Sequence, residues 1–290
     1  MNKEQLTRRQ HLSLEEKIII TNERIKEWYE AWEGQVYISF SGGKDSTVLL
    51  DLVRKQYPEV KAVFINTGLE YPEILKFVKT IDNVDVIRPK MRFKDVIDKY
   101  GYPIISKENA EKIYQIRNAK SQKTINKRLY GDEKGNGKLP EKWKYLINSD
   151  IKIHSYCCYI LKKNPIKKYE KENKLMPIVG TMASDSRLRE TNYLKHGCNS
   201  FNTRPMSLPM SFWLEKDVWE YIHKYNIPYS KIYDMGYERT GCMFCMIGLH
   251  LDKNIKNKFE IMKETHPKHY DYCINKLGCG KVLDLLNVKY

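Results

Sequence analysis

The chain has 290 residues, a formal net charge of +15 and a hydrophobic fraction of 41%, which is enough apolar material for one or two folded domains. This composition excludes a wholly disordered protein. No run approaches the roughly 18 consecutive apolar residues that a membrane span needs, and the polar start of the sequence lacks the apolar core of a secretory signal. We therefore expect a cytoplasmic protein with no membrane partner.

Strands and helices are expected to alternate along the first third of the chain. The segment 13–32 opens with the capping-box pattern Ser13 to Glu16 and carries apolar residues at helical spacing, which predicts an N-terminal amphipathic helix. Strands are then expected at 36–40, 61–65 and 84–87, and helices from 47, over 71–81 and over 93–99. This alternation predicts a Rossmann-like α/β fold, a parallel sheet with helices on both faces.

The second half of the chain is expected to complete the same fold. A later strand is predicted at 176–180, and helices are predicted over 215–225 and 255–263. The expected organisation is an N-terminal helix over 1–34, an α/β domain over 35–250 with a basic insertion near 107–174, and a helical C-terminal tail over 251–290.

The positive charge is concentrated in the insertion. Residues 107–174 hold 18 Lys and Arg against 8 Asp and Glu, so 10 of the 15 net charges lie in this segment. Such a cluster indicates either a surface that binds a polyanion such as nucleic acid or a lysine-rich face that only contacts water.

A glycine-rich turn directly follows the first predicted strand and precedes a helix. This construction gathers backbone N–H groups and the positive end of a helix dipole at one point, which is how proteins commonly bind phosphate. In the loop Ser41 to Ser46, Gly42 and Gly43 allow close approach of the backbone, and the two serines add hydroxyl groups. Lys44 supplies a positive charge, and Asp45 can orient the loop or hold Mg²⁺.

Other residues are expected to share this crevice. Ligands in open α/β sheets bind at the carboxyl ends of the strands. We therefore expect Ser39, at the end of the first strand, and Thr67 and Gly68, after the second, to line the nucleotide site.

Seven cysteines cannot all pair as disulfides, and four of them form two close pairs. Cys157 and Cys158 are adjacent, whereas Cys242 and Cys245 form a CxxC motif. Adjacent Cα atoms are about 3.8 Å apart, an awkward bite for one tetrahedral zinc ion and an easier one for two irons of a cluster. We expect these four residues to bind a [4Fe-4S] cluster; zinc binding and redox-active or simply buried thiols are the alternatives. Each of the remaining three, Cys198, Cys273 and Cys279, is expected to be a small buried apolar residue.

Together these motifs resemble the phosphoadenosine phosphosulfate (PAPS) reductase family, which has an adenine nucleotide alpha hydrolase-like fold. The resemblance spans about residues 35–250 and rests on the SGGKDS loop, on the cysteine doublet followed by Leu161, Lys162 and Pro165, and on the stretch from Pro209 to Cys245. The doublet with a CxxC is similar to the iron–sulfur branch, which includes adenylyl-sulfate reductases and the PP-loop protein of DNA phosphorothioation systems.

The resemblance implies a set of ligands and roles. The loop would hold the pyrophosphate of ATP, or a PAPS or adenylyl-sulfate substrate, and Lys44 and Arg189 would stabilise charge on the transferred phosphate. Gly180 and Ser186 align with the family's nucleotide-binding signature together with Arg189. A cysteine desulfurase or a thioredoxin-like protein would serve as sulfur donor partner.

Two departures from the family pattern bear on the substrate. Met182 stands where the signature carries its first arginine, which removes a bidentate anion contact. The reductases also carry a C-terminal Glu-Cys-Gly-x-His tail, whereas this chain reads Leu277-Gly278-Cys279-Gly280-Lys281-Val282. Either Cys279 is a reactive thiol beside lysines, or the Gly-Cys-Gly turn simply ends a helix.

Three functions follow as hypotheses. The first is a PP-loop ATP pyrophosphatase that activates a substrate at the α-phosphate for sulfur transfer, with nucleic acid as one candidate acceptor. The second is an adenylyl-sulfate or PAPS reductase that releases sulfite. The third is a nucleotide-dependent nucleic-acid-binding component without turnover. The sequence leaves the acceptor, the sulfur donor and the oligomeric state open.

Overall fold

The computed structural model describes residues 2–202, 204–251 and 256–290. The chain forms two compact units. The first comprises Met1–Asn66, Tyr71–Arg88 and Ile166–Tyr233, and the second comprises Thr67–Glu70, Pro89–Pro165 and Asp234–Tyr290. Among the described residues, no helix is long and apolar enough to cross a membrane.

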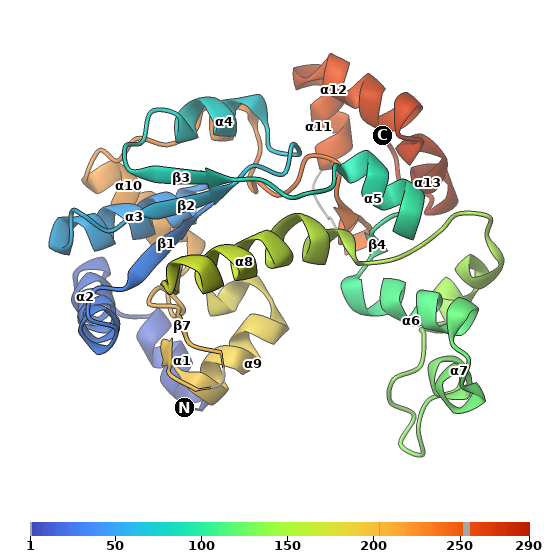
Figure 1. Cartoon of the computed structure of the whole chain (residues 1–290), viewed down its shortest axis with the longest axis horizontal. Helices are drawn as coiled ribbons and strands as arrows, with labels where there is room; N and C mark the ends of the chain where they lie inside the picture. The colour runs from blue at the N-terminus through green and yellow to red at the C-terminus, as the bar shows by residue number, and fades with distance from the viewer. Residues whose placement is uncertain (1, 203, 252–255) are drawn as a thin grey trace. The chain divides into compact units, whose positions relative to one another are not determined.

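A six-stranded sheet forms the centre of the first unit (Figure 1). Its strands lie in the order β3-β2-β1-β5-β7-β6, and all neighbouring pairs are parallel except β6 with β7. The strands are β1 (Val36–Phe40), β2 (Ala62–Ile65), β3 (Val84–Ile87), β5 (Met176–Val179), β6 (Asn199–Ser200) and β7 (Met206–Ser207). The predicted Rossmann-like α/β fold is confirmed.

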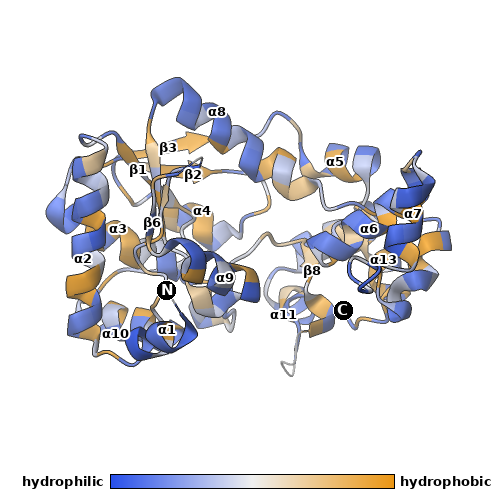
Figure 2. Cartoon of the chain, turned by 90° about the horizontal axis from the view of Figure 1, so that it is seen from below, coloured by the Kyte–Doolittle hydropathy of each residue, from blue (hydrophilic) through white to orange (hydrophobic). Residues whose placement is uncertain are grey.

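Helices cover both faces of this sheet because successive side chains of a buried strand point to opposite faces. On β1, the Phe40 ring lies 6.4 Å from Phe77 of α4 (Pro72–Val78), on the face that α3 (Lys44–Gln56) also covers. On the opposite face, the Tyr37 ring meets Tyr169 of α8 (Asn164–Asn173) edge-on at 5.8 Å. Figure 2 shows hydrophobic strands beneath a largely hydrophilic α8.

A buried ion pair joins two helices that flank α3. The helix α2 (Leu14–Ala31) begins with the predicted capping box between Ser13 and Glu16. Its Lys17 ammonium lies 2.5 Å from the Asp217 carboxylate of α10 (Glu215–Lys224), and both side chains are almost fully buried. A buried pair of this kind is costly to break, because the remaining charge would be left without compensation. The pair therefore fixes the start of α10, where Glu215 lies.

The remaining elements of the first unit are short. They are α1 (Lys3–Gln10), η3 (Ala183–Asp185) and α9 (Arg187–His196). A further short helix, η4 (Tyr233–Met235), begins at Tyr233, the last residue of the first unit.

The second unit is mainly helical. Its only described sheet pairs β4 (Ile104–Ile105) with β8 (Met246–Ile247) in parallel. Its helices are α5 (Phe93–Tyr100), α6 (Lys107–Asn118), α7 (Gln122–Leu129), η1 (Glu141–Asn148), η2 (Tyr159–Lys163), η5 (Leu249–Leu251), α11 (Lys258–Thr265), α12 (Pro267–Asp271), η6 (Tyr272–Lys276) and α13 (Cys279–Leu285).

Three local expectations differ from the structure. The helix expected from 47 begins at Lys44, because Gly43 is its N-cap. Helix α11 covers most of the helix predicted over 255–263, but Ile255 lies outside the described residues. The Gly278–Gly280 turn ends a helix, as one of the two alternatives expected, but it also begins another, since Gly278 follows Leu277, the C-cap of η6, and is the left-handed N-cap of α13.

Candidate functional site

The loop Ser41–Ser46 lies at the carboxyl end of β1, where α3 begins. Gly42 has a φ of +73°, and a Cβ atom there would come within 2.9 Å of Ile74 and Val78 side chains. Only glycine meets both constraints. The glycine therefore lets the chain turn tightly from β1 into α3 and packs the loop against α4.

Hydroxyl groups hold the loop in shape. The Oγ atoms of Ser41 and Ser46 lie 3.0 Å apart, and the Ser46 Oγ donates to the Gly43 carbonyl at 2.9 Å. The Ser41 Oγ also accepts a hydrogen bond from the Gly43 N–H at 3.3 Å. These bonds preorganise the amides at the start of α3, where a phosphate would be bound.

Lys44 lies in a small cage of residues that sequence reasoning did not find. Its ammonium is 3.0 Å from the Glu215 carboxylate and lies over the rings of Trp219 and Tyr233. The Lys44 N–H donates to the Tyr233 hydroxyl at 2.8 Å. The cage depends on contacts between segments about 170 to 190 residues apart, so no local signal reveals it.

Asp45 faces a mixed group of charges. Its Oδ1 is buried and has no hydrogen-bond partner among the described residues. Burial raises the pKa of Asp45, whereas the positive charge of Lys44 opposes this shift. Asp185 and Arg189 also act on it electrostatically, so the start of α9 lies near the loop. A buried carboxylate oxygen without a partner fits a candidate Mg²⁺ ligand.

The nucleotide-signature residues lie next to the loop through the adjacent strand β5. Gly180 follows β5, and a Cβ atom there would be 3.0 Å from the Asp45 carbonyl oxygen. Ser186 caps α9 by accepting a hydrogen bond from the Arg189 N–H. The Arg189 guanidinium pairs with Asp185. Met182 is buried, only 3% exposed, and its apolar side chain offers no charge to an anion.

The four paired cysteines of the sequence line one cavity in the second unit. Leu69, Phe93, Pro103, Leu161 and Lys162 also line it. The doublet lies just before η2, and the CxxC forms a turn in which the Cys245 N–H donates to the Cys242 carbonyl at 3.1 Å. Two segments separated by 83 residues (242 − 158 − 1) therefore present their thiols to a common space.

Positive charge accompanies these thiols. A hydrogen bond from Cys157 lowers the pKa of Cys158 to about 6, and Lys107 and Lys162 act in the same direction. The charge of Cys242 in turn raises the pKa of Lys162, which hydrogen-bonds with it. Lys107 and Lys162 therefore favour the thiolate of Cys158, the form that binds metal, whereas the hydrogen bond with Cys158 raises the pKa of Cys157 and burial raises that of Cys242.

The segment expected to extend the nucleotide site is attached to the CxxC turn. The Met243 N–H donates to the Leu69 carbonyl at 2.7 Å. Thr67 is buried, and its Oγ1 donates to Glu70 at 2.6 Å, while Gly68 is exposed with a φ of +76°. Thr67 and Gly68 thus belong to the second unit, whereas Ser39 and the loop belong to the first.

The four thiols are not arranged as a ready-made metal site. In the part of the chain that the structure describes, no group of three or more His, Cys, Asp or Glu is arranged to hold a metal ion. Cys157 hydrogen-bonds with Cys158, and Cys242 hydrogen-bonds with Lys162. Four cysteines that share one cavity are a donor set that suits an iron–sulfur cluster or a zinc ion.

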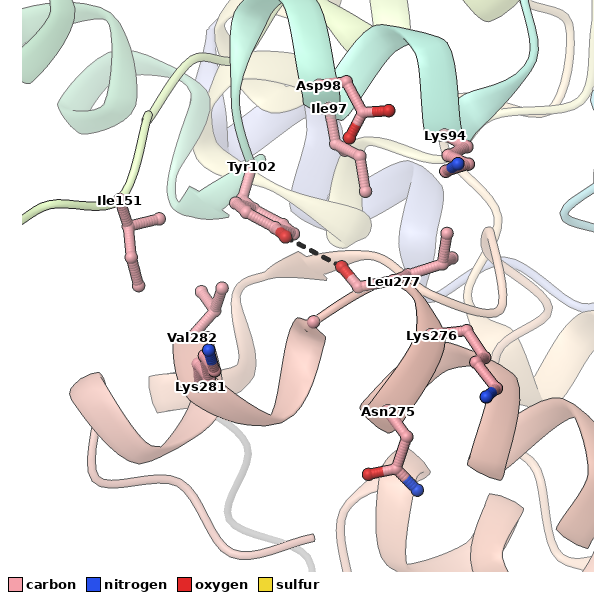
Figure 3. A pocket seen from close by; sticks show the side chains of 11 residues that line it. Lys94, Ile97, Asp98, Tyr102, Ile151, Asn275, Lys276, Leu277, Lys281 and Val282 are labelled. Atoms are coloured by element: carbon pink, nitrogen blue, oxygen red, sulfur yellow. Dashed lines mark hydrogen bonds between the residues drawn. The ribbon is translucent and has the colours of Figure 1, made fainter.

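The three other cysteines are buried, as expected. Burial raises the pKa of Cys198 to about 11. Cys273 and Cys279 have no exposed surface, and their thiols hydrogen-bond with each other. Figure 3 shows a cavity of about 290 Å³ beside this segment, where the Tyr102 hydroxyl donates to the Leu277 carbonyl at 2.7 Å. Neither thiol lines that cavity.

The fold and the loop define the class of the protein. A strand, a glycine turn and a helix N-terminus at the carboxyl edge of a parallel sheet make a nucleotide-binding α/β fold of the PP-loop type. The family model described as "Phosphoadenosine phosphosulfate reductase domain" matches residues 35–247. The chain belongs to this family of enzymes.

Named relatives vary in how much of their length the chain covers. An uncharacterized protein of Methanocaldococcus jannaschii is 30% identical over 227 residues, which are 76% of this chain but only 38% of that protein. An adenosine 5'-phosphosulfate reductase of Staphylococcus epidermidis is 27% identical over 76% of this chain and 74% of its own. A PAPS reductase structure from Candida auris aligns with a TM-score of 0.43 and 17% identity, over 83% of this chain and 96% of its own.

Proposed function

We propose that this enzyme is an ATP pyrophosphatase that adenylates its substrate for sulfur transfer, with a [4Fe-4S] cluster held by Cys157, Cys158, Cys242 and Cys245. The observation that carries the proposal is the complete loop beside a buried methionine. Met182 replaces the arginine of the sulfonucleotide signature and is buried, while serine hydroxyl groups hold the phosphate-binding loop in shape.

The chemistry begins at the α-phosphate of ATP. An oxygen of the acceptor attacks the α-phosphorus, and the bond to pyrophosphate breaks, so that an adenylated acceptor and pyrophosphate are formed. The loop amides bind the leaving pyrophosphate, and Asp45 would hold Mg²⁺. Lys44 and Arg189 leave their carboxylate partners, Glu215 and Asp185, to stabilise the charge that develops on the phosphate.

Sulfur then replaces the activated oxygen. Hydrosulfide attacks the carbon that carries the activated oxygen, the bond from that carbon to the oxygen breaks, and AMP leaves with the oxygen. With a cysteine desulfurase as donor, its persulfide yields hydrosulfide when two thiols, such as those of a thioredoxin-like protein, supply two electrons and become a disulfide. When bound, the cluster would supply iron as a Lewis acid and as an electron reservoir. Lys162 and Lys107 keep the surrounding charge positive.

Product analysis tests the proposal directly. Protein purified without oxygen is incubated with ATP, adenylyl sulfate or PAPS, in the presence of sulfide and single-stranded RNA or DNA. We expect pyrophosphate from ATP and no sulfite from either sulfonucleotide. Sulfite release without pyrophosphate would contradict the proposal.

The reductase function is the second candidate, and the Staphylococcus epidermidis relative favours it. A reductase of this kind needs an accessible thiol, but Cys279 is fully buried against Cys273. We therefore expect Cys279 to react with Ellman's reagent at least about 100-fold more slowly in the folded chain than in the denatured chain, because burial blocks access. The measurement compares Cys279→Ser with the unchanged chain.

Activity separates the two functions further. The Cys279→Ser variant should retain pyrophosphate release. A fast-reacting Cys279, together with loss of sulfite production in this variant, would favour the reductase instead. Cys198→Ser serves as the matched control, since Cys198 is also buried but lies in the first unit.

A further inference from the structure

An aromatic cluster includes the two tyrosines that flank the cysteine doublet in the sequence. We call it the first ring set; its members are Tyr100, Tyr114, His154, Tyr156 and Tyr159. Tyr156 and Tyr159 stack with their ring centres 5.0 Å apart and their planes 22° apart. His154 lies 4.1 Å from the Tyr114 ring and 5.3 Å from Tyr156. All members belong to the second unit, so their arrangement is internal to it.

The first ring set packs on a buried histidine and exposes three of its tyrosine rings. His154 is only 7% exposed, and burial lowers its pKa, so a neutral imidazole supports the rings. Tyr114, Tyr156 and Tyr159 are each 37% exposed. Rings that are held in place by packing and are exposed at the surface offer flat faces on which another planar group can stack. Little side-chain entropy is lost in such binding, because the rings are already ordered.

A second ring set lies in the same unit, and lysine ammonium groups lie over two of its rings. It consists of Tyr130, Trp143 and Tyr145, of which Tyr130 is 70% and Tyr145 48% exposed. The Lys144 ammonium lies 6.0 Å from the Tyr130 ring centre, and Lys142 lies 5.2 Å from that of Trp143. Lysine and aromatic side chains therefore alternate on this part of the surface.

Unbalanced positive charge surrounds both sets. Helix α7 has no buried residue and no acidic residue, and it carries Lys123, Lys127 and Arg128. Between residues 107 and 142, the exposed lysines are Lys107, Lys120, Lys123, Lys127, Lys134, Lys138 and Lys142. Some basic groups of this stretch also serve the fold, since Arg117 donates to backbone carbonyls, Lys127 lies 3.9 Å from Asp132 and Lys107 hydrogen-bonds with Cys158.

Exposed aromatic rings together with exposed lysines favour one class of partner. An acidic protein would match the lysines but would not need several tyrosine faces. A nucleic-acid duplex would match the lysines too, but its bases are already stacked. Unpaired bases on a phosphate backbone match both features, because every base has a face that stacks on an aromatic ring.

We propose that the two ring sets and the exposed lysines bind a single-stranded nucleic acid, with bases stacked on Tyr156 and Tyr159 next to Cys157 and Cys158. That this strand is the acceptor of sulfur rests on the proposed function; the binding itself does not. The surface also gives the excess of ten positive charges in residues 107–174 a physical role.

Fluorescence anisotropy tests the binding with the full-length protein. The probes are a labelled mixed-sequence 20-mer as RNA, the same sequence as DNA, and the DNA duplex. We expect single strands to bind at least 10-fold more tightly than the duplex, and the double variant Tyr156→Leu/Tyr159→Leu to lose about 10-fold or more of this affinity. The variant Tyr156→Phe/Tyr159→Phe should restore it, because the ring faces remain.

Controls keep the outcome decisive. Tyr272→Leu removes a tyrosine of the same unit that is 45% exposed and outside both sets, and it should not change affinity. Lys142→Gln with Lys123→Gln should reduce the slope of log affinity against log salt by about 2. Equal affinity for the duplex and the single strand would overturn the proposal. So would a Tyr156→Leu/Tyr159→Leu variant that unfolds at the same temperature as the unchanged protein and binds the single strand with the same affinity.

The two proposals fail separately. Strand binding without pyrophosphate release from ATP would overturn the proposed function and leave the surface intact. Pyrophosphate release and iron binding without strand binding would support the proposed function and overturn the strand-binding surface.

Discussion

Serine in place of any one of Cys157, Cys158, Cys242 or Cys245 should abolish the iron–sulfur cluster. All four thiols line one cavity, and the positive charges of Lys107 and Lys162 favour the thiolate form of Cys158. A missing thiolate leaves the cluster with an incomplete Cys₄ set, which we expect to be lost on purification. The measurement is iron and sulfide content with the absorption near 400 nm, on protein prepared without oxygen.

Controls for this prediction come from the same chain. Cys198→Ser and Cys273→Ser remove buried thiols that do not line the cavity, so they should retain full iron content. Stoichiometric zinc in a colourless protein prepared anaerobically would contradict the cluster. Equal iron loss in Cys198→Ser would show that unfolding, rather than ligand loss, is the cause.

Methionine in place of Lys44 should reduce pyrophosphate release from ATP by about 100- to 1,000-fold. Lys44 is the only lysine of the loop, and removal of one preorganised charge at a developing oxyanion costs about 3 to 4 kcal/mol. Methionine retains the stem that packs against Trp219 and Tyr233. The measurement is the rate of pyrophosphate release under saturating ATP.

The matched control is Lys55→Met on the same helix. Lys55 also lies over two aromatic rings, Tyr221 and Tyr225, and pairs with Asp51, but it is remote from the loop at the C-terminal end of α3. We expect its turnover to stay within about twofold of the unchanged enzyme. Comparable turnover in Lys44→Met and Lys55→Met would remove Lys44 from the proposed mechanism.

The fold of the first unit could be predicted from local patterns. Strands β1 to β3 and β5 are short and apolar, which is typical of a sheet covered on both faces, and Gly42 with Gly43 indicates the turn into α3. The second unit was harder to predict. Its helix α7, for example, buries none of its residues, so no face that packs on a core identifies it in the sequence.

The features of the candidate sites also fall into two classes, those that local sequence determines and those that tertiary packing decides. The sequence by itself determined the loop, the two cysteine pairs and the family, because each depends on residues at fixed short spacings. Tertiary structure alone decided that Glu215 and Tyr233 contact Lys44, and that Leu69 bonds to the CxxC turn. It also decided that Cys279 is buried rather than presented as a reactive tail. The physical reason is that ion pairs, ring contacts and burial depend on which distant segments pack together, and no spacing along the chain records that.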